Sequence, residues 1–387
     1  MNAMLSPFFL SAFAWNFSLS MSYLLIPLYA LDLGFSGLQI GSLIGLPIVL
    51  QLVCNLVSGV LVDRLGAKNI TLIASLGTGL AGVVYALSGS FAGLLAGQLL
   101  FMIARAAFWP ANWALASQLP GDNNRNMGFL NSTTNAGQIV GIACSGIVAE
   151  WAGYRAGFWV MAALSMVSLG ITVLIRYKRP AQAGKRASIF STYRTLATVK
   201  PMYLAILCSF IACIPFTMSS SFYPVLFVEQ GFSSDAAGWL LALRAIGAIF
   251  AGLLLARWVR SAESRGIPIG SGMVIVATLA LIPLSGNAWA IGLLMAAIGL
   301  ASGILTVYFQ MQIANSSPPE LRGSAMSYGG LGWQLCNFLV PPIMGGLRDE
   351  LGIQFAFIAI AGLMLASTLA IAPVHLWAYL GRTRKNP

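Results

Sequence analysis

Charged side chains are scarce in this chain: Asp, Glu, Lys and Arg together make up 8% of its 387 residues. A water-soluble protein of this length could not cover its surface with so few charges, so a soluble globular fold is excluded. Apolar residues amount to 58%. They gather in stretches of about 20, the length that a helix needs to cross a bilayer. The sequence therefore predicts an all-α integral membrane protein.

Twelve stretches of this kind follow one another and leave no room for a soluble domain between them. Because lipid offers the backbone no hydrogen-bond partners, each stretch is expected to cross the membrane as a helix. The expected transmembrane helices cover about residues 6–30, 39–62, 69–90, 93–117, 128–151, 157–176, 201–228, 236–257, 268–285, 288–314, 324–346 and 354–378.

Acidic side chains and histidine are especially rare, at ten and one. Each carboxylate falls at a predicted helix end or in a loop, and His375 is given a packing role near the inner end of the last helix. The five cysteines lie inside predicted spans, as small packing residues rather than as a disulfide framework or a metal site. The bundle thus offers no nucleophile, metal cluster or acid pair. An enzyme is not expected, and neither is a cofactor.

The 21 basic residues give the chain a formal net charge of +11, but they are spread unevenly. With the N-terminus placed inside, all of them except Arg105, Arg155, Arg244 and Arg348 fall in cytoplasmic loops or tails. By the positive-inside rule, this predicts a multi-pass protein of the cell (inner) membrane with both termini in the cytoplasm. No basic stripe remains for phosphate contacts, so nucleic acid is excluded as a partner.

One pattern, Gly-x-x-x-acid-x-x-Gly, recurs at the ends of the apolar stretches, and a degenerate fourth copy keeps Gly252. Repetition of a helix-end motif indicates an internally duplicated membrane bundle, an organisation typical of transporters. The three complete copies are Gly59-Asp63-Gly66, Gly146-Glu150-Gly153 and Gly345-Asp349-Gly352.

The two halves of the chain are also related to each other. Asp32-Leu33-Gly34-Phe35-Ser36 after the first helix is matched by Glu229-Gln230-Gly231-Phe232-Ser233 after the seventh. Two six-helix halves, each made of two three-helix units of opposite orientation, are the simplest interpretation. The expected organisation is a first half at residues 1–176, a cytoplasmic linker with an amphipathic helix at 177–200, a second half at 201–378 and a cytoplasmic tail at 379–387.

The loop between the second and third helices carries the most specific motif. It runs from Gly59 to Lys68 and reads Gly-Val-Leu-Val-Asp-Arg-Leu-Gly-Ala-Lys. It resembles the signature loop of the major facilitator superfamily, and Gly153-Tyr154-Arg155 before helix six resembles a second pattern of that family. The resemblance extends over nearly the whole chain. It implies a twelve-helix fold in two pseudo-symmetric halves and a monomeric protein.

The carboxylates of the repeated motif suit a gating role. A carboxylate near a helix end can hold the positive N-terminal end of a neighbouring helix, and glycines let that helix approach. The resemblance implies that Asp63 holds helix two to helix eleven at the cytoplasmic face. We expect Asp63 to steady an outward-open state and the external Glu150 and Asp349 an inward-open state; plain helix capping is the alternative. The predicted gating residues are Gly59, Asp63, Arg64, Gly66, Lys68, Glu150 and Asp349.

The resemblance also implies that helices one, four, seven and ten line a central path, flanked by two, five, eight and eleven. The distribution of polar residues agrees with this arrangement. Helices three, six, nine and twelve are nearly free of amides, as expected of helices that face lipid. On helix four, Arg105, Trp109 and Asn112 share one face. The predicted substrate-binding residues are Asn16, Tyr23, Arg105, Trp109, Asn112, Asn135, Gln138, Arg244, Tyr308, Gln312, Gln334 and Asn337.

Arg105 and Arg244 are the two charges expected in the middle of the membrane, where an arginine costs about 2.5–3.5 kcal/mol to insert. Guanidinium grips carboxylate or phosphate with paired hydrogen bonds, so a path with arginines and no acid favours anionic substrates. Gating, proton coupling and a structural role are the alternatives for the arginines. The helix-four arginine of the family is usually followed by Gln-Gly, where this chain has Phe108-Trp109. Helical packing is the alternative role for Trp109.

The expected function is secondary active or facilitative transport of a small organic solute, anionic and amphipathic, by alternating access. The alternative is a proton-coupled multidrug or metabolite exporter, with a proton or another ion as coupling partner. Proton antiport of cations is disfavoured, because the cavity helices carry no acid and helix five lacks the Gly-Pro of the family's antiporter motif. A receptor that binds a ligand without moving it is the remaining interpretation.

Overall fold

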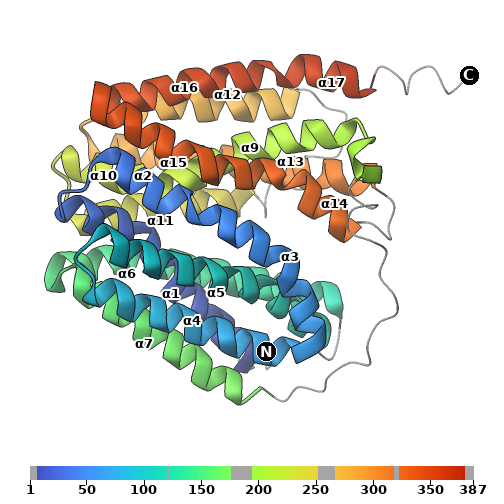
Figure 1. Cartoon of the computed structure of the whole chain (residues 1–387). Helices are drawn as coiled ribbons and strands as arrows, with labels where there is room; N and C mark the ends of the chain where they lie inside the picture. Colours follow the sequence, from blue (N-terminus) through green and yellow to red (C-terminus); the bar gives the residue numbers. More distant parts are fainter. Residues whose placement is uncertain (1–6, 120–121, 176–193, 252–265, 318–321, 380–387) are drawn as a thin grey trace, which may run out of the picture. The chain divides into compact units, whose positions relative to one another are not determined.

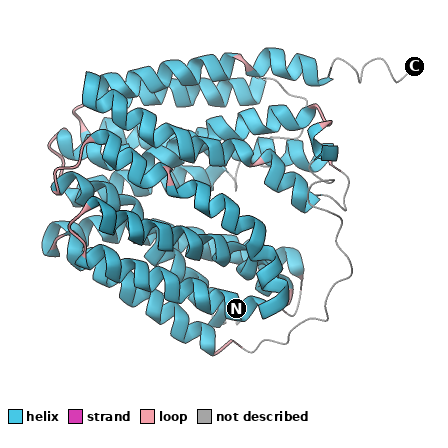
Figure 2. Ribbon diagram, viewed as in Figure 1, coloured by secondary structure: helices cyan, strands magenta, loops and turns pink. Residues whose placement is uncertain are grey.

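The computed structural model describes residues 7–119, 122–175, 194–251, 266–317 and 322–379. Within these ranges every regular element is a helix and there is no strand, as Figure 2 shows. The all-α fold expected from the sequence is thereby confirmed. Residues 177–193 of the linker, with most of its expected amphipathic helix, and residues 380–387 of the tail lie outside the described residues.

The chain folds into two compact units, whose helices can be followed in Figure 1. The first unit takes in Met1–Ala183 together with Ser219–Ala242. Its helices are α1 (Pro7–Asp32), α2 (Gly37–Gly45), α3 (Pro47–Leu65), α4 (Ala67–Leu87), α5 (Phe91–Ser117), α6 (Asn123–Ala152), α7 (Tyr154–Val173), α10 (Phe222–Glu229) and the first part of α11 (Ser234–Phe250).

The second unit takes in Gly184–Met218 and Leu243–Pro387. The division into six-helix halves with a boundary at residues 177–200 stays a prediction. The helices of this unit are α9 (Pro201–Ser219), the second part of α11, α12 (Gly266–Leu281) with the 3₁₀ turn η2 (Ile282–Leu284), α13 (Ala288–Ser316), α14 (Arg322–Gly329), α15 (Leu331–Leu351), α16 (Ile353–Leu369) and α17 (Ile371–Tyr379).

Within the described ranges, each of the twelve predicted spans coincides with one helix or with two consecutive helices; residues 6, 176 and 252–257, at the ends of three spans, lie outside these ranges. Four spans are interrupted: α2 gives way to α3 at Pro47, and the pairs α9 and α10, α14 and α15, and α16 and α17 are separated by short breaks. Nine helices of the described chain are long and apolar enough to cross a membrane. The exceptions are the amide-containing α6 and α15 and the 17-residue α11.

The repeated motif marks helix ends, as its position in the sequence predicted. The last glycine of each copy has a positive φ: 88° at Gly66, 84° at Gly153 and 82° at Gly352. A new helix begins at the next residue in all three cases. Residues with a Cβ rarely adopt this conformation, which explains why glycine stands at the junction.

Small residues bring the helices of the first unit close together. In Figure 1, α4 lies alongside α7, and a Cβ added to Gly82 of α4 would lie 3.0 Å from the Phe158 carbonyl oxygen of α7. The contact of α6 with α1 is closer, since a Cβ on Gly137 would lie 2.6 Å from the Phe13 carbonyl oxygen. Backbone contact at small residues is the usual way in which membrane helices pack.

The second unit uses the same device. A Cβ on Gly303 of α13 would lie 2.6 Å from the Ala248 carbonyl oxygen of α11, and Gly299 meets the Arg244 backbone in the same way. At the start of α15, Gly332 lies against the Ile206 carbonyl oxygen of α9. This last contact holds α9 and α15 side by side. The polar side chains of Thr217 and Asn337, described below, lie between these two helices.

Candidate functional site

In the first unit, α5 carries an arginine one turn before two residues of an aromatic cluster. Arg105 and Trp109 are one turn apart on α5, and both are half-buried. The rings of Trp15 and Phe108 are stacked with centroids 3.4 Å apart, and Trp109 meets both of them edge-on at 6.4 and 5.6 Å. The Trp15 indole also donates to the Thr78 hydroxyl at 3.1 Å. The rings beside Arg105 are therefore held in place by one another and by α4.

Buried amides lie on the helices around this cluster. Asn112 is fully buried and donates to the Phe108 carbonyl at 3.0 Å, but its side-chain oxygen has no partner among the described residues. The same is true of the buried Gln51 oxygen on α3. Asn16 donates to the Ala12 carbonyl of its own helix at 2.9 Å. Two amide oxygens of this unit can thus still accept a hydrogen bond.

Three further predicted residues of this unit lie on α1 and α6. Tyr23 on α1 is buried, whereas Asn135 and Gln138 on α6 are half-buried. The backbones of α1 and α6 are in contact at Gly137, so these side chains belong to neighbouring helices. Their role in binding stays a prediction.

In the second unit, Arg244 of α11 is 4% exposed and lies over the Phe216 ring, with its guanidinium carbon 5.9 Å from the ring centroid. Phe216 in turn contacts the Trp333 ring at a centroid distance of 5.6 Å. A guanidinium over an aromatic face is a favourable arrangement in a site from which water is excluded. Both units therefore combine one buried or half-buried arginine with aromatic side chains.

The amides of the second unit are engaged within the unit. Asn337 accepts from the Thr217 hydroxyl at 3.0 Å and donates to the Trp333 carbonyl at 3.0 Å. Gln312 donates to the Tyr379 hydroxyl at 2.5 Å. Tyr308 is fully buried and Gln334 is half-buried. Gln334 is thus the least buried of these four residues.

Two predicted gating residues hold helix ends. The Glu150 carboxylate accepts from the backbone N–H of Ser234, the first residue of α11, at 2.8 Å. Lys68 donates to the carbonyls of Val173 and Ile175 at 2.8 and 2.7 Å, at the C-terminal end of α7. Arg64 is exposed in the last turn of α3, and Gly66 ends that helix. The surroundings of Gly59 and the side chain of Asp63 lie outside the described part of the structure, so the Asp63 contact stays a prediction.

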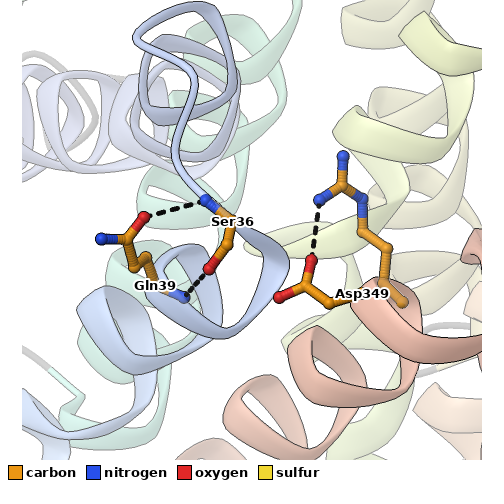
Figure 3. A network of polar contacts seen from close by, with 4 residues as sticks. Ser36, Gln39 and Asp349 are labelled. Carbon is orange, nitrogen blue, oxygen red and sulfur yellow. Dashed lines mark hydrogen bonds and ion pairs between the residues drawn. The ribbon is translucent and has the colours of Figure 1, made fainter.

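Figure 3 draws two further polar contacts at helix ends. Ser36 and Gln39 form a reciprocal cap at the start of α2, with hydrogen bonds of 3.2 and 2.9 Å. Asp349 forms an ion pair with the adjacent Arg348 at 3.5 Å. Such an exposed pair contributes little to stability.

Several residues of these clusters were missed in the sequence. Trp15, Phe216 and Trp333 are aromatic residues in apolar helices, and nothing in their spacing separated them from ordinary packing residues. Gln51 did carry a signal, since it is an amide in the middle of an apolar span. It was overlooked although the other flanking helices, five, eight and eleven, did supply predicted site residues.

Known proteins resemble this chain over nearly its whole length. The family model described as the Major Facilitator Superfamily matches residues 8–208 and 205–386. Multidrug resistance protein MdtG of Escherichia fergusonii is 23% identical over 389 residues, which cover 95% of this chain and 92% of that protein.

Two solved structures show the same fold. The nucleoside transporter NupG superimposes with a TM-score of 0.79 at 16% identity, covering 97% of this chain and 99% of its own. A bacterial homologue of the human lysosomal transporter Spinster, inward-facing and unoccupied, gives a TM-score of 0.76 at 15% identity, with 97% and 96% covered. From the family match and from this fold, we conclude that the chain belongs to the Major Facilitator Superfamily and is a membrane transporter.

Proposed function

We propose that this transporter moves a small amphipathic organic solute that carries an anionic group and a ring or other flat apolar body. The observation that carries the proposal is the position of Arg105 on α5, one turn before Phe108 and Trp109, whose rings pack against Trp15 of α1. An arginine in a membrane is costly, and a carboxylate or phosphate is the group that satisfies it best.

The distribution of acids supports the same substrate class. Every carboxylate in the described helices lies at a helix end, including Asp32, Glu229 and Asp349. The described helices therefore present no carboxylate away from their ends that would repel an anionic solute. The attraction between such a solute and a guanidinium is strong where water is excluded.

The amide oxygens of Gln51 and Asn112 suggest a further feature of the solute. Each is buried and has no partner in the described part of the chain. A buried acceptor that stays unsatisfied costs about 1–3 kcal/mol, so a hydroxyl or amine on the solute would be favoured beside its anionic group.

Alternating access is the mechanism that suits these units. In this proposal, the contact between Glu150 and the start of α11 closes the predicted external end, and Asp63 acts at the predicted cytoplasmic end. Glycines on both sides of the first contact allow α6 and α11 to meet directly. We further propose that both termini lie in the cytoplasm and that the transporter works as a monomer.

A multidrug exporter is the second candidate, because relatives with 22–25% identity are named multidrug resistance proteins. The aromatic cluster beside Arg105 would also serve a hydrophobic cation if stacking dominated the binding. The two candidates differ in whether the charge of Arg105 attracts or repels the solute.

The test is a thermal-shift panel on the protein in nanodiscs, comparing an aromatic carboxylate, tetraphenylphosphonium and a neutral sugar. We expect the carboxylate to raise the melting temperature of the wild type, to do so less for Arg105→Lys and not at all for Arg105→Ala. The matched control is Arg194→Ala, which removes an exposed arginine outside the membrane and should leave the shift intact. Stabilisation by tetraphenylphosphonium that persists in Arg105→Ala would favour the exporter of cations instead.

Counterflow in proteoliposomes then separates transport from binding. Liposomes loaded with the stabilising carboxylate should accumulate a labelled trace of it through the wild type. Binding without counterflow would contradict transport of that solute and would indicate a receptor.

A further inference from the structure

A closed group of hydrogen bonds joins α9 to α15 inside the second unit. Thr217 of α9 donates to the Asn337 side-chain oxygen at 3.0 Å. The Asn337 amide donates back to the sulfur of Cys213 at 3.1 Å and to the Trp333 carbonyl at 3.0 Å. Every polar group of the cluster is engaged, so the two helices are held in one register.

Two thiols from different helices meet in this cluster. The sulfurs of Cys213 on α9 and Cys336 on α15 both lie 3.3 Å from the Thr217 hydroxyl oxygen. Both cysteines are fully buried and reduced. The backbones are in contact one turn before Cys336 and two turns before Cys213, at Gly332 and Ile206, so both sulfurs lie around one hydroxyl where the two helices are close.

We propose that Cys213 and Cys336 form a two-thiol binding site for a soft divalent metal ion of the mercuric class. Thiolate sulfur selects soft ions, and mercury(II) is satisfied by two sulfurs in a linear arrangement. The described residues hold no group of three or more His, Cys, Asp and Glu side chains placed around one point. Zinc, which takes four ligands in structural sites, is therefore not accommodated.

Charge also selects the ion. Two thiolates and one divalent ion make a neutral complex, whereas two thiolates with a monovalent silver or copper ion would leave a net negative charge. Burying an unpaired charge in an apolar interior is expensive, so the neutral complex is strongly preferred. Mercuric chloride is itself a neutral molecule, which lets it reach a site inside the membrane.

The binding step conserves atoms and electrons. Each S–H bond breaks, two mercury–sulfur bonds form, and two protons leave with the two chlorides that the ion had carried. No atom changes its oxidation state. The product links α9 to α15 covalently through the metal, in addition to the hydrogen bonds that join them already. This site is independent of the proposed substrate and its direction of movement.

The test uses mercuric chloride on the purified full-length protein in nanodiscs, followed by washing with excess glutathione. A single thiol exchanges its mercury to glutathione, but a pair held in register retains it. We expect the wild type to keep about one mercury per chain after the wash. Cys213→Ser and Cys336→Ser should each retain about tenfold less mercury per chain, or less still. Serine keeps the hydrogen-bond pattern and so preserves the fold.

Cys208→Ser is the matched control, because Cys208 is an equally buried cysteine on α9 outside the cluster. It should keep the mercury. Retention by either cluster variant, loss in Cys208→Ser, or no retention by the wild type would overturn the proposal. A second measurement needs no variant: alkylation after unfolding should find Cys213 and Cys336 protected by the metal and the other three cysteines modified.

Discussion

The carboxylate of Glu150 at the end of α6 caps the first turn of α11 by accepting the Ser234 backbone N–H at 2.8 Å. The N–H groups of a first helical turn have no partner within their own helix, and a negative charge there also meets the positive end of the helix dipole. Glu150 therefore joins two helices that are distant in sequence. The group it binds is a backbone N–H, which any residue except proline would supply at position 234. The contact belongs to the first compact unit, in which both residues lie.

Removal of the charge should weaken this contact. We expect Glu150→Gln to shift the balance between open and closed external ends by about two- to fivefold toward the open form, because a charge at an exposed helix end contributes about 0.5–1 kcal/mol. The measurement is cysteine labelling from the predicted external side. Glu350→Gln, an exposed carboxylate in the last turn of α15, is the control and should change nothing.

Close backbone approach of α6 to α11 is the second requirement of the contact. Gly146 lies against the Ser234 carbonyl, and a Cβ on Gly238 would lie 3.0 Å from the Ile142 carbonyl oxygen. We expect Gly146→Ala to force the helices apart and to lower stability by about 1–3 kcal/mol. The free energy of unfolding in detergent measures this. Gly128→Ala on the same helix meets nothing within 4 Å and should be nearly neutral; equal losses in both would contradict the argument.

The sequence predicted the helices, their glycine ends and the class of contact made by Glu150. These features depend on local rules: apolar length, the positive φ that favours glycine at Gly153, and the polarity of a helix end. Local rules do not name the partner, and nothing in the sequence pointed from Glu150 to Ser234.

The polar residues of the spans were harder to interpret. Periodicity shows which residues share a helix face, but not which neighbour that face meets. Asn337 and Gln312 were expected to contact the substrate, yet their amides bond to Thr217 and Tyr379 of the same unit. In contrast, Gln51 was not expected and has a buried oxygen without a partner in the described ranges.

Lys68 of the signature loop should contribute to stability as a cap of α7. Its ammonium group donates to the carbonyl of Val173, the last residue of α7, and to that of Ile175, two residues further on. A cation at a helix C-terminus is favourable, so we expect Lys68→Met to lower the melting temperature through a loss of about 1 kcal/mol. Lys68→Arg keeps the charge and should recover most of the loss. A melting temperature unchanged in Lys68→Met would rule out the capping role.

Asn337 and Gln334 offer a comparison between structure and transport on a single helix. The Asn337 amide is part of the cluster that joins α9 to α15, so Asn337→Leu leaves Thr217 without its acceptor. We expect a stability loss of about 1–2 kcal/mol, the range found for hydrogen bonds between membrane helices.

Gln334 is half-buried and its side chain makes no hydrogen bond among the described residues, so Gln334→Leu should leave the melting temperature within error of the wild type. If Gln334 faces the solute, the same change should lower the rate of counterflow or raise the concentration needed for half-maximal rate. Asn337→Leu should thus lower stability, whereas Gln334→Leu should lower transport and leave stability intact. Loss of stability in Gln334→Leu with intact transport would contradict a solute contact for Gln334. An unchanged stability in Asn337→Leu would contradict a structural role for Asn337.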